Sequence, residues 1–200
     1  MKRSSKKHGQ WQDHYSLRAK KERYPARSVY KLQEIQKKYN IIKKGAKVID
    51  LGCAPGSWIL YAAELTGNTG RVIGIDLVPV TISVPSHVKC YTGDILLMDD
   101  DFFGSLGTDF NVVISDMAPS TTGSKFVDST RSFDLCRTAL YTAQKTLATG
   151  GSFVCKIFQG EDFKVFIDSV RSVFKSHKIF KPKSSRKASK EIYIIGFEKK

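Results

Sequence analysis

The sequence has no long apolar run. Its longest stretch without Asp, Glu, Lys or Arg is 51–63, which is shorter than the ~20 apolar residues that a membrane-spanning helix needs. The first residues, MKRSSKKH, precede GQWQD rather than an apolar segment, which argues against a secretory signal. We therefore expect an intracellular protein that does not cross a membrane. The cytoplasm is the expected compartment, with the mitochondrion and the nucleolus as alternatives.

Cysteine is scarce and scattered. The chain has four cysteines, with no C-x-x-C pair and no clustered histidine, at Cys53, Cys90, Cys136 and Cys155. This spacing suits neither a zinc site nor a disulfide framework. We predict no bound metal, and we interpret the four cysteines as free thiols that are mostly buried.

Charge of one sign is depleted in three regions. Residues 1–31 hold ten basic and two acidic side chains, and residues 175–190 hold seven basic and no acidic ones. The middle, 45–130, is the reverse, with four basic against ten acidic residues. Basic ends favour a polyanionic partner such as RNA, and an acidic centre suits a pocket for a cationic or hydroxyl-rich small molecule. Solvated tails are the alternative, but base-stacking aromatics are interleaved in the first region: Trp11, Tyr15, Tyr24 and Tyr30.

Two hundred residues fit a single domain, with residues 1–27 as a basic, RNA-binding appendage. Apolar periodicity and turn residues predict alternating strands and helices. The strands are expected at 47–51, 71–76, 88–91, 110–116, 152–157, 178–180 and 191–198, and the helices from Ser28 to before Gly45, at 57–65, at 129–147 (closed by Gly150 and Gly151) and at 163–174. This order predicts a Rossmann-like α/β fold with a mainly parallel sheet. The last two strands lack an intervening helix, so the final strand is expected to be antiparallel.

A glycine-containing loop, Asp50-Leu-Gly-Cys-Ala-Pro-Gly56, follows the first strand. It lacks the G-x-G-x-x-G pattern of dinucleotide sites and looks instead like the S-adenosylmethionine loop of Rossmann-like methyltransferases. We therefore predict S-adenosylmethionine as the cofactor, with Asp50 facing its cationic end, Asp76 its ribose and Asp94 its adenine. Turn formation is the alternative role for these carboxylates, and core packing is the alternative for Trp58. The complete predicted cofactor set is Asp50, Gly52, Pro55, Gly56, Trp58, Asp76, Asp94 and Asp116.

Two lysines and two carboxylates are expected to meet at the same sheet edge. Asp116 and Lys156 end parallel strands, Glu191 starts the antiparallel one, and Lys31 lies on the first predicted helix. These residues, in this order, resemble the Lys-Asp-Lys-Glu tetrad of the FtsJ (RrmJ-like) family of ribose 2′-O-methyltransferases. The resemblance extends over nearly the whole chain, through RSVYKL, VIDLGCAPGSW, SDMAP, GGSFVCKIFQGE, KSSR and KEIY. Cys53 is one departure, at a position often occupied by alanine.

The resemblance implies that Lys31, Asp116, Lys156 and Glu191 are catalytic. A neutral lysine could accept the proton of a ribose 2′-hydroxyl, provided that burial or a neighbouring cation such as Lys31 depresses its pKa. A structural ion-pair network is the alternative reading of the four residues. The expected RNA contacts are Arg27, Lys183, Ser185 and Arg186, together with Ser184.

The expected substrate is a uridine of large-subunit ribosomal RNA, either naked or in a ribosomal particle. Transfer RNA is the alternative substrate. A catalytically silent RNA-binding assembly factor is the alternative of another class, and the intact tetrad argues against it. We expect a monomer.

Overall fold

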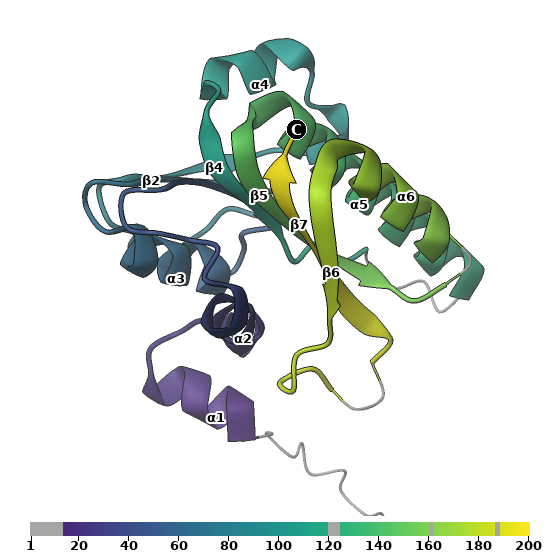
Figure 1. Cartoon of the computed structure of the whole chain (residues 1–200). Helices are drawn as coiled ribbons and strands as arrows, with labels where there is room; N and C mark the ends of the chain where they lie inside the picture. Colours follow the sequence, from purple (N-terminus) through teal and green to yellow (C-terminus); the bar gives the residue numbers. More distant parts are fainter. Residues whose placement is uncertain (1–13, 120–124, 161, 187–188) are drawn as a thin grey trace, which may run out of the picture.

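The computed structural model describes residues 14–119, 125–160, 162–186 and 189–200. These residues form a seven-stranded sheet in the order β3-β2-β1-β4-β5-β7-β6, shown in Figure 1. The strands are β1 (Lys47–Leu51), β2 (Arg71–Asp76), β3 (Val88–Thr92), β4 (Phe110–Ser115), β5 (Leu147–Phe158), β6 (Phe174–Phe180) and β7 (Glu191–Lys199). The helices are α1 (His14–Lys21), α2 (Val29–Tyr39), α3 (Ser57–Thr66), α4 (Asp100–Leu106), α5 (Lys125–Thr146) and α6 (Phe163–Val173), with a short 3₁₀ helix η1 (Ile95–Leu97).

Strands β1 to β5 are parallel, and β7 runs antiparallel to both β5 and β6. The predicted Rossmann-like α/β class and the antiparallel final strand are therefore confirmed. This topology places the carboxyl ends of the parallel strands and the start of β7 at one edge, because Phe158 pairs with Glu191. Ligands bind at this edge in open α/β sheets.

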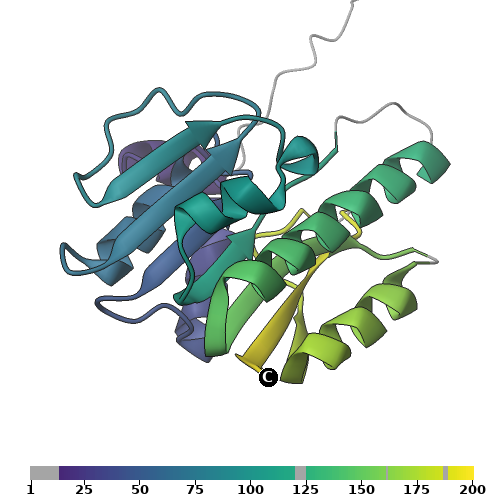
Figure 2. The same ribbon diagram turned by 90° about the horizontal axis from the view of Figure 1, so that it is seen from above.

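Helices cover both faces of the sheet (Figures 1 and 2). Helices α2 and α3 pack on one face, and α4, α5 and α6 pack on the other. Strand β1 is buried except at Lys47, as expected of a parallel strand covered on both sides. Its Val48 faces the α2–α3 layer, whereas Ile49 and Leu51 face the α5–α6 layer. Both faces of the strand are therefore covered, and Asp50 is its buried polar residue.

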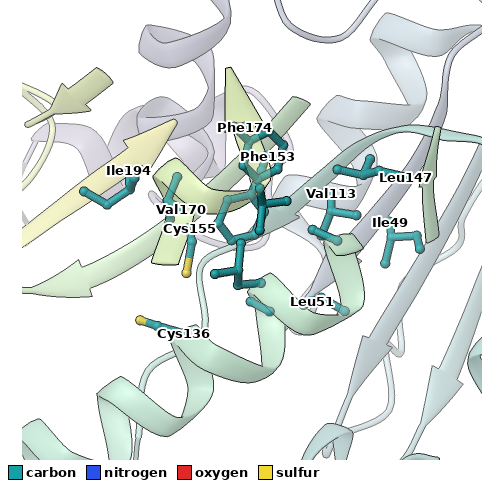
Figure 3. Close-up of a cluster of buried hydrophobic side chains, with 14 of the residues drawn as sticks. Ile49, Leu51, Val113, Cys136, Leu147, Phe153, Cys155, Val170, Phe174 and Ile194 are labelled. Carbon is teal, nitrogen blue, oxygen red and sulfur yellow. The ribbon is translucent and has the colours of Figure 1, made fainter. Parts of the chain in front are cut away.

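The larger core lies between the sheet and α5–α6 (Figure 3). The rings of Phe153 and Phe174 stack there, 5.7 Å apart. Cys136 and Cys155 are free thiols in this core, and both donate to the main-chain oxygen of Lys156, at 3.1 and 3.3 Å. Truncating a buried phenylalanine to alanine typically lowers the free energy of unfolding by about 3–5 kcal/mol. Because Phe153 lies on β5, its packing in this core stabilises the strand that carries Lys156.

The connection from β4 through α5 to β5 differs from the prediction. Helix α5 spans Lys125–Thr146 rather than 129–147, and it passes directly into β5 at Leu147. The Gly150–Gly151 pair, expected to close the helix, instead lies inside β5 near a register irregularity. Gly150 has φ +83°, and a Cβ on Gly151 would lie 2.9 Å from the Ala148 carbonyl oxygen. The two glycines therefore permit a bulge, which is the other structural use of a glycine pair.

Several further boundaries differ. Strand β6 begins at Phe174 rather than 178, and Asp116 follows β4 instead of ending it. Helices α1 and α4 and the 3₁₀ helix η1 were not predicted, because they are short, at eight, seven and three residues. The sequence does contain a start signal for α4, because Asp99 is its N-cap and accepts a hydrogen bond from the Phe102 amide.

The described part of the proposed N-terminal appendage is anchored on the domain. Ala19 of α1 is buried with Val29 and Tyr30 of α2, and Tyr15 and Tyr24 pack against them. Residues 1–13, with the predicted stacking residue Trp11, lie outside the described residues. Among the described residues, no helix combines the length and apolar character needed to cross a membrane.

Candidate active site and cofactor cavity

The four predicted catalytic residues meet at the carboxyl edge of the sheet. Lys156 Nζ lies 3.0 Å from Asp116 Oδ1, and Lys31 Nζ lies 3.7 Å from the same oxygen. Lys31 Nζ also lies 3.0 Å from Glu191 Oε2. All four side chains are largely buried, with exposures between 7 and 14%. The cluster therefore pairs two amines with two carboxyl groups, so each of these buried ionisable side chains has a partner.

Tyr193 is a fifth member of this cluster that sequence reasoning did not assign. Its hydroxyl donates to Asp116 Oδ1 at 2.5 Å. Burial, together with the charges of Asp116 and Glu191, raises the pKa of Tyr193, so the hydroxyl stays protonated as a donor. Asp116 Oδ1 is thus approached by Lys31, Lys156 and Tyr193, while Lys156 Nζ also donates to the main-chain oxygen of Asp116. Tyr193 is part of the KEIY segment, but its hydrogen bond to Asp116 forms only because β7 and the end of β4, far apart in sequence, lie close together in the fold.

A cavity of about 430 Å³ opens beside Asp116. The loops after β1, β2, β3 and β4 form one side of it, and the first turns of α5 form the other. Four predicted cofactor residues line it: Gly52, Asp76, Asp94 and Asp116. The lining also contains residues that the sequence did not single out, chiefly Met117, Arg131, Asp134 and Leu135. The spacing of 131, 134 and 135 on one helical face is the signal that could have identified them.

Close approach of the chain shapes the glycine loop. Gly52 has φ +78°, and a Cβ there would lie 2.6 Å from Met117 Cγ. Asp76 holds the loop, because its Oδ2 accepts from the Ala54 amide at 2.8 Å and its Oδ1 from the Val78 amide at 2.9 Å. Each carboxylate oxygen retains a second lone pair for a ligand hydroxyl. Asp76 therefore has a structural role besides the predicted ribose contact.

Asp50 does not line the cavity. It is fully buried on β1, and neither carboxylate oxygen has a hydrogen-bond partner among the described residues. Burial, followed by the charges of Asp116 and Asp76, raises its pKa well above the usual range. Asp50 is absent from the cavity lining, so its predicted contact with the cofactor's cationic end stays a prediction.

Three other predicted cofactor residues lie in or next to the loop but outside the cavity lining. Trp58 is buried in the α2–α3 core, where its Nε1 donates to the Ser28 carbonyl oxygen at 2.8 Å. Gly56 has φ +115°, and a Cβ there would lie 2.4 Å from Ile82 Cδ1. Pro55 follows a cis peptide bond. The cavity lining does not include these three residues.

The predicted RNA contacts flank the tetrad. Arg27 Nη2 donates to the Ser184 carbonyl oxygen, and burial and the charge of Arg186 lower the pKa of Arg27. Lys183 and Arg186 are exposed, whereas Ser185 is buried with its hydroxyl unpartnered among the described residues. Glu34, which the sequence did not indicate, accepts from the amides of residues 183 and 184 at 2.7 and 2.8 Å.

The cavity suits S-adenosylmethionine on three structural grounds. Gly52 lies in the cavity wall without a side chain, and the loop there packs closely on Met117, which lines the same cavity. Asp76 and Asp94 present carboxylates to the cavity for hydroxyl and amino donors. The acidic tetrad residue Asp116 lies in both the cavity wall and the ion-pair cluster. A group held in this cavity would therefore lie against Asp116, which pairs with both lysines.

Known proteins similar to this chain agree with that assignment. A family model described as FtsJ-like methyltransferase matches residues 24–199. A Desulforapulum autotrophicum protein named ribosomal RNA large subunit methyltransferase E is 59% identical, over 99% of this chain and 98% of the relative. A relative of the same name from Desulfosudis oleivorans is 53% identical, over 100% of this chain and 97% of its own length.

Solved structures show the same fold. A Plasmodium falciparum chain named as a ribosomal RNA methyltransferase is 26% identical with a TM-score of 0.77, covering 88% of this chain and 98% of that one. Aeropyrum pernix fibrillarin, solved with S-adenosyl-L-methionine, is 16% identical with a TM-score of 0.59, covering 78% and 68% of the two chains. The second likeness concerns the fold alone. With the family model matched over 176 of its 200 residues, this chain belongs to the FtsJ-like methyltransferase family.

Proposed function

We propose that this chain uses S-adenosylmethionine to methylate a ribose 2′-hydroxyl of large-subunit ribosomal RNA, specifically of a uridine. The observation that carries the proposal is the meeting of the Lys31–Asp116–Lys156–Glu191 cluster with the cofactor cavity at Asp116. The names of the relatives at 59% and 53% identity support the choice of ribosomal RNA.

The proposed chemistry uses the amines to handle the substrate hydroxyl. When bound, S-adenosylmethionine supplies an electrophilic methyl group that is attacked by the ribose oxygen. Lys156 Nζ accepts the hydroxyl proton or orients the hydroxyl, while Asp116 holds this amine in place at 3.0 Å. Lys31, paired with Glu191 at 3.0 Å, supplies the second cation of the site.

In the proposed cofactor site, Gly52, Asp76 and Asp94 make the contacts from the cavity wall. Asp76 takes the ribose and Asp94 the adenine end. Asp50, Pro55, Gly56 and Trp58 contribute through the shape of the loop and not as residues of the cavity lining.

The remaining parts of the proposal concern partners and compartment. The partner is RNA, contacted through Arg27, Lys183, Ser185 and Arg186, and the protein acts as a monomer. We propose the cytoplasm as its compartment because the reported relatives, named for large-subunit ribosomal RNA, are bacterial.

Methyl transfer from labelled S-adenosylmethionine to purified large-subunit RNA, large ribosomal particles and transfer RNA tests the proposal. We expect label in the ribosomal substrate, at one nucleotide that becomes resistant to alkaline cleavage because its 2′-oxygen is blocked. Label in transfer RNA alone would show that transfer RNA, and not ribosomal RNA, is the substrate. Cofactor binding without methyl transfer to any RNA would favour the assembly-factor alternative.

A further inference from the structure

We propose that a groove beside the active site binds the single-stranded RNA that flanks the methylated nucleotide. Helix α1, helix α2 and the end of β6 with residue 183 enclose about 650 Å³. We call it the α2 groove. This inference rests on the proposed function, because it assigns a path to the same RNA.

Charge favours a polyanion in the α2 groove. Lys37, Lys38 and Lys183 line it and are exposed. The acidic lining residue, Glu34, already accepts from the amides of 183 and 184 at 2.7 and 2.8 Å. Arg18 is paired with Glu22 at 2.7 Å and contributes less. Three exposed lysines therefore face the groove with little opposing charge, as a phosphate backbone requires.

Aromatic rings lie between these cations. Tyr15 and Phe180 line the groove and are partly exposed, and Tyr15 packs on Tyr30 with 5.4 Å between ring centroids. Lys38 Nζ lies 4.9 Å from the centroid of the Phe180 ring. Alternating rings and cations characterise sites for single-stranded nucleic acid, where bases stack and phosphates are neutralised.

The α2 groove continues from the catalytic residues along one helix. Lys31, Glu34 and Lys38 occupy positions i, i+3 and i+7 of α2, so they form one stripe on its surface. At 1.5 Å per residue, the stripe runs for about 10 Å. Its other wall, at residue 183, belongs to the segment that leads to Glu191, which pairs with Lys31. A strand whose ribose reaches Lys31 can therefore extend directly into the groove.

A charge-matched pair of variants tests the proposal. The groove variant is Lys37→Gln, Lys38→Gln and Lys183→Gln; the control variant is Lys44→Gln, Lys89→Gln and Lys164→Gln, at exposed lysines outside the groove lining. Affinity is measured by fluorescence anisotropy against salt, with a ribosomal RNA fragment that keeps its flanking strands. Log affinity falls as log salt rises, and the loss of three phosphate contacts makes this negative slope shallower by about 2 in the groove variant. The control variant has the same net charge as the groove variant, and its slope is expected to stay closer to that of the wild type.

A second substrate localises the effect. With an RNA trimmed to the target loop, wild type and groove variant are expected to have the same slope, because the strand that fills the groove is gone. Equal slopes for the groove and control variants on the long RNA would overturn the proposal. A shallower salt dependence in the groove variant alone, together with a wild type that transfers no methyl group, would support RNA binding in the α2 groove. It would contradict the proposed function. Matching melting temperatures and cofactor affinities exclude misfolding as the cause.

Discussion

The carboxylate of Asp116 is the common partner of three side chains in the candidate site. One oxygen, Oδ1, lies 3.0 Å from Lys156 Nζ, 3.7 Å from Lys31 Nζ and 2.5 Å from the Tyr193 hydroxyl. An amine held in this way can act on the substrate hydroxyl either as a base or as an orienting cation.

Lys156→Met separates these roles, because methionine keeps the apolar stem and removes the amine. We expect turnover to fall roughly a hundredfold or more, the usual contribution of a positioned proton-transfer group, while S-adenosylmethionine and RNA bind nearly as before. Single-turnover methylation measures this. A wild-type rate that rises with pH identifies a base, and a flat profile identifies an orienting cation. Near-normal rates in the variant would remove Lys156 from the mechanism.

Asp50 is the clearest case of a carboxylate whose burial destabilises the folded chain. Its pKa is raised by burial and by the charges of Asp116 and Asp76. Below about pH 3.9, the group is protonated in both the folded and unfolded states. As the pH rises from there through the raised folded-state pKa, the unfolded chain releases the proton first, and the free energy of unfolding falls.

Asp50→Asn removes this titration and keeps the side chain's shape. We expect urea unfolding of the wild-type protein to show a stability component that decreases with pH, and this component to be missing in the variant. Unfolding free energies from pH 5 to 8, without cofactor, measure the difference. The same pH slope in both proteins would mean that Asp50 is not the titrating group.

At the scale of elements, α2 and the segment before β7 are joined beside the tetrad. Glu34 accepts from the amides of 183 and 184, and Arg27 donates to the carbonyl oxygen of 184. The helix that carries Lys31 is thus tied to the chain that leads to Glu191. These two residues face one another across 160 positions of sequence.

Glu34→Gln weakens this connection, because an amide side chain has one oxygen to accept from two backbone amides. We expect faster hydrogen exchange at the amides of 183 and 184, corresponding to a local loss of about 1–3 kcal/mol, and a higher KM for RNA. Glu198→Gln is the matched control, since Glu198 pairs with Lys175 on the exposed sheet edge. Unchanged exchange in Glu34→Gln would rule out the connecting role.

For the whole molecule, opposite charges occupy neighbouring surfaces at one sheet edge. Carboxylates line the cofactor cavity at Asp76, Asp94, Asp116 and Asp134, with Arg131 as its cation. The basic ends of the chain, by contrast, flank the tetrad through α1, α2 and 181–186. A small cofactor and a polyanion are thereby drawn to different parts of the same edge.

Salt is expected to affect the two ligands differently. Between about 50 and 200 mM salt, RNA affinity is expected to fall roughly a hundredfold if about five phosphates are neutralised. Affinity for S-adenosylmethionine is expected to change little, because its binding releases few counterions. Calorimetry for the cofactor and anisotropy for RNA give the two slopes. Equally shallow slopes would contradict a binding surface made from the basic ends.

The sequence by itself determined the order of the seven strands and of helices α2, α3, α5 and α6, and with it the mainly parallel sheet, because apolar periodicity and turn residues are local properties of the chain. It also placed Asp116, Lys156 and Glu191 at the ends of strands, while their catalytic role came from the resemblance to the FtsJ family. It also marked Gly52 and Asp76 for the cavity they line. Only the tertiary structure decided that Asp50 and Trp58 lie behind that cavity, that α5 forms its other wall, and that Tyr193 and Glu34 support the site. These depend on contacts between residues far apart in sequence, and no local pattern encodes which side chain fills the space between two distant elements.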